Sequence, residues 1–285
     1  PRSAGRSYTL HVSSGGGPFS LWGYTLDARP GELATAGLET SVRELRYRTF
    51  YTLTGRGALA SLIDLLKRHG PLWVLALALV PLPGVLLLLV RPGLVARWDA
   101  AAWLALALAL GLAVWPLLWA ALSAAGARWS GPLLWVVLAL GWVAALGRGW
   151  QQRHLLPRWR RHHTLLILLL VAALAVRALA VRDLAFPPWV DSVRHGLIAS
   201  IMVESGQLIE GYRPWLPVDR FPYHWGFHVL PAMLMQMTGR AVTEVLLATG
   251  QLINALAVLA VYAAAWLMTR QRDVALLAAF LTAFP

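Results

Sequence analysis

The chain has 285 residues, of which 58% are hydrophobic and only 13% charged, and its mean hydropathy is +0.60. A soluble domain carries about twice that charged fraction, so these values exclude an ordinary soluble enzyme and indicate an integral membrane protein. The net charge of +12 comes mainly from short loops between apolar runs, which is typical of membrane topology signals and of contact with anionic lipid headgroups. We therefore expect membrane lipids, and no nucleic acid, as partners. The lack of cysteine excludes disulfides, thiolate metal sites and a cysteine nucleophile.

The N-terminal part of the sequence differs from the rest. Residues 1–56 contain aromatic and β-branched runs such as "SYTLHV" and "LRYRTFYTLT", separated by glycine- and proline-rich turns. This pattern predicts a small β-rich extracytoplasmic segment, the end of a sandwich-like domain. Residues 57–70 then place leucines and an isoleucine at helical spacing, which predicts an interfacial amphipathic helix that Gly70 and Pro71 stop.

The rest of the chain predicts an α-helical multi-span membrane protein. Runs of the length needed to cross a bilayer lie at about 72–90, 100–122, 132–147, 164–181 and 242–268, with a shorter one at 222–237. The first run contains Pro81 and Pro83, which predict a kink. The sequence starts at Pro1 without a signal-like segment and stops inside the apolar run "LLAAFLTAFP". We therefore expect about six to seven membrane helices and a fragment of a longer protein.

The basic residues predict the orientation of the helices. Residues 71–163 hold three predicted membrane helices, and their last loop, 148–163, is the most basic stretch of the chain. Such loops stay in the cytoplasm, so alternation places the N-terminal segment and the long connection 182–221 outside a plasma membrane. The connection 182–221 is the longest polar segment of the helical part, and we expect the chemistry to lie there.

The first half of this outer connection predicts a helix with two faces. In "DSVRHGLIASIMVESG", one face would carry Val193, Leu197, Ile198, Ile201 and Met202. Asp191, Arg194 and His195 would share another face, at spacing i, i+3 and i+4. Charge near a membrane is costly, so these three residues are functional candidates. In the alternative interpretation, Asp191 caps the helix, Arg194 anchors a headgroup and His195 pairs with Asp191.

The second half of the connection, "GYRPWLPVDRFPYHWGFH", carries further polar and aromatic residues. Arg213 and Arg220 are either substrate ligands or interface anchors beside tryptophans. His224 and His228 are four residues apart, a spacing that suits a metal, but two histidines without a third ligand specify little. We therefore assign no residue as a metal ligand.

Residues 164–285 resemble integral-membrane glycosyltransferases of the GT-C fold, which use dolichyl- or polyprenyl-phosphate-linked sugars. The resemblance rests on Asp191 and His195, then "ESGQL", then "FPYHWGFHVLPAMLMQMTG". The family's essential aspartate corresponds to Asp191, and its aromatic entry to the second core helix corresponds to Tyr223, His224, Gly226, Phe227 and His228. The sequence departs from the family by having Ser192 where many members have a second acidic residue, and "YHWGFH" where a proline is common. The β-rich segment and the first three spans lie outside the resemblance.

The resemblance implies inverting transfer of a sugar from a polyprenyl-phosphate-linked donor to an envelope acceptor hydroxyl at the outer membrane face. Asp191 would be the base and His195 would orient it or bind sugar hydroxyls. The residues expected to bind substrate are Arg194, Arg213, Arg220, Tyr223, His224, His228, Trp189 and Trp225. We assign no cofactor, and a divalent metal stays open. The sequence does not indicate an oligomeric state.

Two other functions remain open from the sequence. One is a transporter or flippase for lipid-linked saccharide, or a polysaccharide-export component, and the other is a non-catalytic envelope scaffold. Transporters place ions and broken helices at mid-membrane, whereas the polar residues of this chain gather in the outer connection. Arg177 lies near the end of a span, where its side chain can reach the interface. This distribution favours the enzyme.

Overall fold

The computed structural model of the protein describes residues 54–94, 98–187, 190–221 and 223–284, together with two short strands. The strands are β1 (Gly23–Tyr24) and β2 (Glu44–Leu45), which pair antiparallel. The predicted β-rich segment 1–56 otherwise lies outside the described residues. Each of these strands has two residues, whereas strands in globular proteins usually have about five to six. The described residues therefore do not support a β-rich domain.

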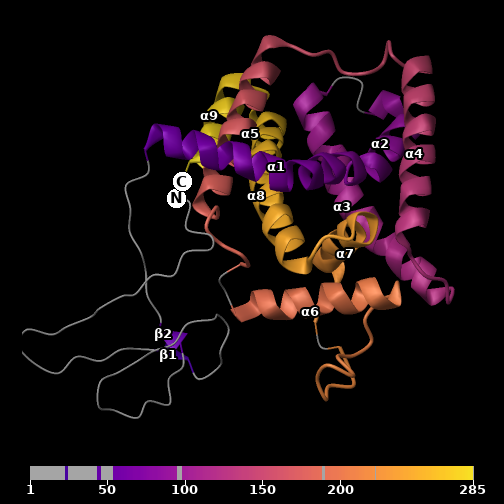
Figure 1. Ribbon diagram of the computed structural model, residues 1–285. Coiled ribbons are helices and arrows are strands. Elements are labelled where there is room, and N and C mark those ends of the chain that lie inside the picture. The colour runs from indigo at the N-terminus through magenta and orange to yellow at the C-terminus, as the bar shows by residue number, and fades with distance from the viewer. Residues whose placement is uncertain are drawn as a thin grey trace, which may run out of the picture. The chain divides into compact units, whose positions relative to one another are not determined.

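The rest of the described chain is helical (Figure 1). Its elements are α1 (Gly55–Leu79), α2 (Leu82–Val90), the 3-10 turn η1 (Pro92–Leu94), α3 (Ala100–Ala124), α4 (Gly131–Gln151), α5 (Arg161–Ala180), α6 (Val190–Ser205), α7 (Gly226–Thr238), α8 (Val242–Thr269) and α9 (Arg272–Ala283). The predicted helical fold class is thus confirmed.

Five segments of the described chain are long and apolar enough to cross a membrane, namely α1 with α2, α3, α4, α5 and α8. The expected number was six to seven. The two further predicted helices correspond to α7 and α9, which have 13 and 12 described residues. A helix needs about 20 residues to cross the hydrocarbon core, so α7 is too short to cross it.

The predicted boundary at Gly70 and Pro71 is wrong. α1 continues through Pro71 to Leu79, so the expected interfacial helix and the first span share one helix. A proline inside a helix removes one hydrogen bond, but the turn after it buries Leu72 and Trp73, and packing of this kind supplies most helical stability in proteins. The chain breaks instead between α1 and α2, where Pro81 and Pro83 predicted a kink.

Tryptophans from neighbouring helices stabilise this break. Pro83 has no N–H, so the carbonyl of Leu79 has lost its helical donor. The indole of Trp115 in α3 donates to that carbonyl at 2.8 Å, and the indole of Trp142 in α4 donates to the carbonyl of Ala78 at 2.9 Å. An unsatisfied carbonyl costs several kcal/mol in hydrocarbon. These two bonds therefore make the break compatible with an apolar environment.

The order of the helices separates two polar ends of the bundle. α8 packs against α3, α5, α6, α7 and α9. The loop 148–163 precedes most of α5 and the connection 182–221 follows it, so they are separated by the 20 residues of that helix, roughly 30 Å at 1.5 Å per residue. In Figure 1, α6 runs across one end of the bundle.

Candidate functional site

Asp191 lies in the first turn of α6, as the second residue of the helix rather than its N-cap. Its side chain is exposed, and within the described part of the chain it makes no hydrogen bond or ion pair. A carboxylate in the first turn interacts favourably with the helix dipole, so a stabilising role remains. Its oxygens are nevertheless available to a ligand.

The predicted division of α6 into two faces is wrong for Val193 and His195. Val193 is 63% exposed, whereas His195 is half-buried and faces α7. The buried stripe of α6 consists of Ser192, Gly196, Ile198, Ala199 and Met202. A Cβ at Gly196 would lie 3.7 Å from the side chains of Val242 and Leu246, so this face of α6 packs against α8. The neighbouring helices, rather than hydropathy alone, determine which face of α6 is buried.

His195 and His228 form the centre of the site. Nδ1 of His195 lies 2.7 Å from Nε2 of His228, which is fully buried in α7. The rings of Tyr223 and Phe227 lie 6.0 and 5.7 Å from that of His195. Burial, together with the neighbouring His195, lowers the pKa of His228 to about 4. His228 is therefore neutral at neutral pH and holds the ring of His195 by a hydrogen bond.

The burial of His228 predicts a loss of stability in mild acid. Its pKa is about 4 in the folded protein and 6.5 in a free chain, so between these values the unfolded chain binds a proton that the folded chain does not. We expect the free energy of unfolding to fall as the pH falls through this window, by up to about 3 kcal/mol. Thermal unfolding in detergent at about pH 7.5 and about pH 5 measures this.

The matched variants for this measurement are His228→Gln and His224→Gln. His228→Gln removes the buried titrating group and is expected to lose most of the pH dependence. His224→Gln changes an exposed histidine of the same segment and is expected to keep the dependence. An equal pH dependence in wild type and His228→Gln would contradict the assignment.

The arginines predicted to bind substrate are not joined to these histidines by any contact among the described residues. Arg194 is exposed and lies near the buried Tyr212. Burial raises the pKa of Tyr212, and the positive charge of Arg194 offsets part of that rise. Arg213 pairs with Asp219 at the surface, and Arg220 is exposed. Arg194 lies in the same helix as Asp191, whereas Arg213 and Arg220 lie in the connection that follows α6.

The remaining predicted residues surround α7. Tyr223 and His224 are exposed, with ring centroids 4.0 Å apart, and the half-buried Trp225 immediately precedes α7. Trp189 lies outside the described residues. The structure thus brings His195, Tyr223 and His228 together, with His224 against Tyr223.

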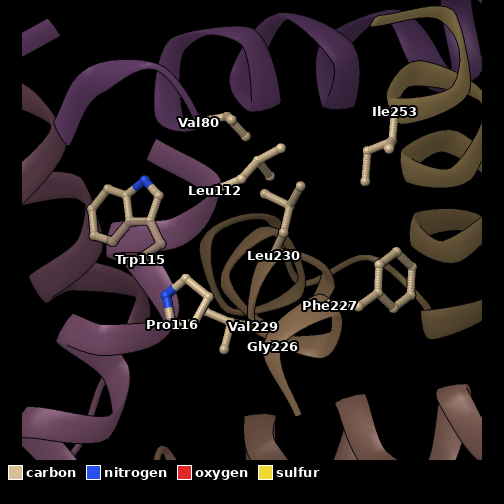
Figure 2. Close-up of a pocket in the computed structure, with 9 residues that line it drawn as sticks. All are labelled: Val80, Leu112, Trp115, Pro116, Gly226, Phe227, Val229, Leu230 and Ile253. Carbon is tan, nitrogen blue, oxygen red and sulfur yellow. The ribbon is translucent and has the colours of Figure 1, made fainter. Parts of the chain in front are cut away.

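An apolar cavity of about 280 Å³ adjoins this site. Its lining includes Val80, Leu112, Trp115, Phe227, Leu230 and Ile253, shown in Figure 2. Phe227 belongs to both features, because its ring also contacts that of His195. The sequence does not indicate this cavity, because its residues come from the α1–α2 junction, α3, α7 and α8 and share no local motif.

A second polar cluster, also missed from the sequence, lies at the opposite end of α5. The carboxylate of Asp99 caps α3 by accepting the N–H of Ala101 at 3.0 Å. Nε2 of His162 and Nε2 of His163 each lie 2.9 Å from an oxygen of that carboxylate. Burial opposes ionisation of Asp99, but the hydrogen bonds from both histidines outweigh it and lower its pKa. The adjacent histidines of "RRHH" were a visible signal, but nothing local connects them to Asp99.

This chain matches no protein-family model, no curated protein and no solved structure. The described part of the chain is helical and has five helices long and apolar enough to cross a membrane, and an aspartate and two histidines lie at the α6 end of the bundle. Asp99, His162 and His163 lie at the other end.

Proposed function

We propose that this chain is part of a membrane glycosyltransferase that moves a sugar from a polyprenyl-phosphate-linked donor to an acceptor hydroxyl, with inversion. One observation carries the proposal. Asp191 presents an exposed carboxylate without a partner among the described residues, one helical turn before His195, whose ring is held by His228. A proton acceptor beside an oriented imidazole, at the end of apolar helices, suits chemistry on a lipid-linked substrate.

The reaction requires little more than these groups. The acceptor hydroxyl must lose a proton as it attacks the anomeric carbon, and Asp191 takes that proton. The bond from the sugar to the phosphate oxygen breaks, and the polyprenyl phosphate leaves as a stable anion, so no acid like that of glycosidases is needed. Positive charge stabilises the departing phosphate. Arg194 supplies it from α6, and Arg213 and Arg220 supply it from the connection.

The lipid part of the donor needs an apolar surface next to the polar groups. The cavity behind Phe227 has about 280 Å³ and an apolar lining, which suits part of a prenyl chain. Burial of each CH₂ group contributes about 0.8 kcal/mol. A donor bound in this way would have its phosphate near α6 and its chain toward the bundle.

The proposal also includes an orientation in a plasma membrane. The basic loop 148–163 would lie in the cytoplasm and the connection 182–221 outside. Their separation by α5 supports this arrangement, because a single span between two segments puts them on opposite sides.

The test is a transfer assay with the full-length protein in liposomes, supplied with radiolabelled polyprenyl-phosphate sugars and a lipid-linked acceptor. We expect labelled acceptor with a new glycosidic bond. A transporter would instead move the labelled donor across the bilayer without forming that bond. A scaffold would do neither, and either of these two results would overturn the proposal.

A further inference from the structure

The cluster of Asp99, His162 and His163 is independent of the proposed transfer site. It joins the start of α3 to the start of α5, whereas Asp191 lies beyond the far end of α5. One ligand atom from each residue lies within 4.8 Å of the other two. Asp99 is buried, His163 is 1% exposed and the His162 side chain is 14% exposed.

The donor atoms form a set that suits a borderline divalent ion. Two imidazole nitrogens and one carboxylate oxygen are ligands that Zn²⁺ binds, whereas Mg²⁺ and Ca²⁺ prefer oxygen alone. In a tetrahedral zinc site, ligand atoms are about 3.3 Å apart, as follows from bonds of about 2.0–2.2 Å. The nitrogen–oxygen distances of 2.9 Å, one to each oxygen of Asp99, are a few tenths of an ångström shorter than this value.

A fourth group points to a ligand at the same place. Tyr262 of α8 is fully buried, and its hydroxyl has no partner among the described residues at ordinary hydrogen-bond geometry. The hydroxyl nevertheless lies beside the carboxylate of Asp99, close enough for a long hydrogen bond with it. A metal ion or a metal-bound water at Asp99 would give this buried hydroxyl a well-placed partner.

Two features of the cluster oppose a cation. Arg272, at the start of α9, interacts electrostatically with His163. Nδ1 of His163 accepts the N–H of Arg160 at 2.9 Å, so without an ion the proton of this neutral ring is on Nε2. Binding through Nε2 would move that proton to Nδ1 and release the N–H of Arg160. This hydrogen bond and the two hydrogen bonds between the histidines and Asp99 would be exchanged for bonds to the metal.

We propose that Asp99, His162 and His163 bind one divalent transition-metal ion of the Zn²⁺ type, with Tyr262 or a water as the fourth ligand. The ion links the ends of α3 and α5 on the side of the bundle away from α6. It stabilises the packing of the two helices and takes no part in sugar transfer.

The test uses the full-length protein in detergent, treated with a chelator and then titrated with ZnCl₂. We expect one tightly bound Zn²⁺ per chain, a higher unfolding temperature on binding, and no such effect with MgCl₂. Replacement of zinc by Co²⁺ is expected to give the visible absorption of a tetrahedral site with nitrogen and oxygen ligands. His162→Ala and His163→Ala are expected to raise the Kd for Zn²⁺ at least about 100-fold.

Controls separate this site from other histidines. His154→Ala changes an exposed histidine of the same loop, and His195→Ala breaks the histidine pair at the other end of the bundle. Both are expected to keep the tightly bound ion. Asp99→Asn preserves volume in case an alanine variant fails to fold. Wild-type protein that binds no ion after chelation, or ligand variants that bind it as tightly as wild type, would overturn the proposal and leave a hydrogen-bonded cluster only.

Discussion

Asp191→Asn is expected to lower kcat for sugar transfer by about 10²–10⁴-fold, the usual contribution of a positioned base. Asparagine keeps the size of the side chain and its place in the first turn of α6, but it cannot accept the proton of the attacking hydroxyl. Donor binding is expected to change little, because the arginines and the apolar cavity remain. Single-turnover transfer with the reconstituted full-length protein measures the loss.

The matched control is Asp273→Asn. Asp273 is also an exposed aspartate in the first turn of a helix, α9, and the proposed reaction does not use it. Each substitution removes a charge that favours a helix start, worth about 0.3–1 kcal/mol, so both variants should lose similar stability. Only Asp191→Asn should lose activity. Equal activity in the two variants would show that Asp191 has a helix-stabilising role alone.

Gly111→Ala is expected to give the largest loss of stability among conservative substitutions in the helices. A Cβ at Gly111 of α3 would lie 1.7 Å from the carbonyl oxygen of Val80. At the same crossing, a Cβ at Gly84 of α2 would lie 1.9 Å from the carbonyl oxygen of Ala107. Backbone atoms cannot move away as a flexible side chain can, so the helices would have to separate. We expect a cost of about 3 kcal/mol, measured by thermal unfolding in detergent.

Gly147→Ala provides the control for this crossing. Gly147 lies inside α4, and a Cβ there would have no neighbouring atom within 4 Å. Alanine in a helix interior is more stable than glycine by about 0.5–1 kcal/mol, so this variant should be as stable as wild type or slightly more stable. A similar loss in both variants would mean that α2 and α3 do not pack backbone to backbone, as small residues allow in membrane helices.

The sequence by itself determined which segments are helical and how apolar they are. The helix that begins at "DSVRHG" was predicted and is observed as α6, and the run 242–268 is observed as α8. These are local properties. An apolar segment that leaves water must satisfy its own backbone groups, and a helix does so within one run of residues. Length then separates α8 from the shorter α7 and α9.

Only the tertiary structure decided which side chains meet. His195 contacts His228 across 33 positions, and His162 contacts Asp99 across 63 positions. Such contacts depend on how each helix is rotated and how closely it packs. That choice placed His195, rather than Val193, against α7. Packing against neighbouring helices also stabilises α1 beyond Pro71, and it places the indole N–H of Trp115 where it donates to the carbonyl of Leu79. Periodicity defines the faces of a helix, but the neighbouring helices select the one that is buried.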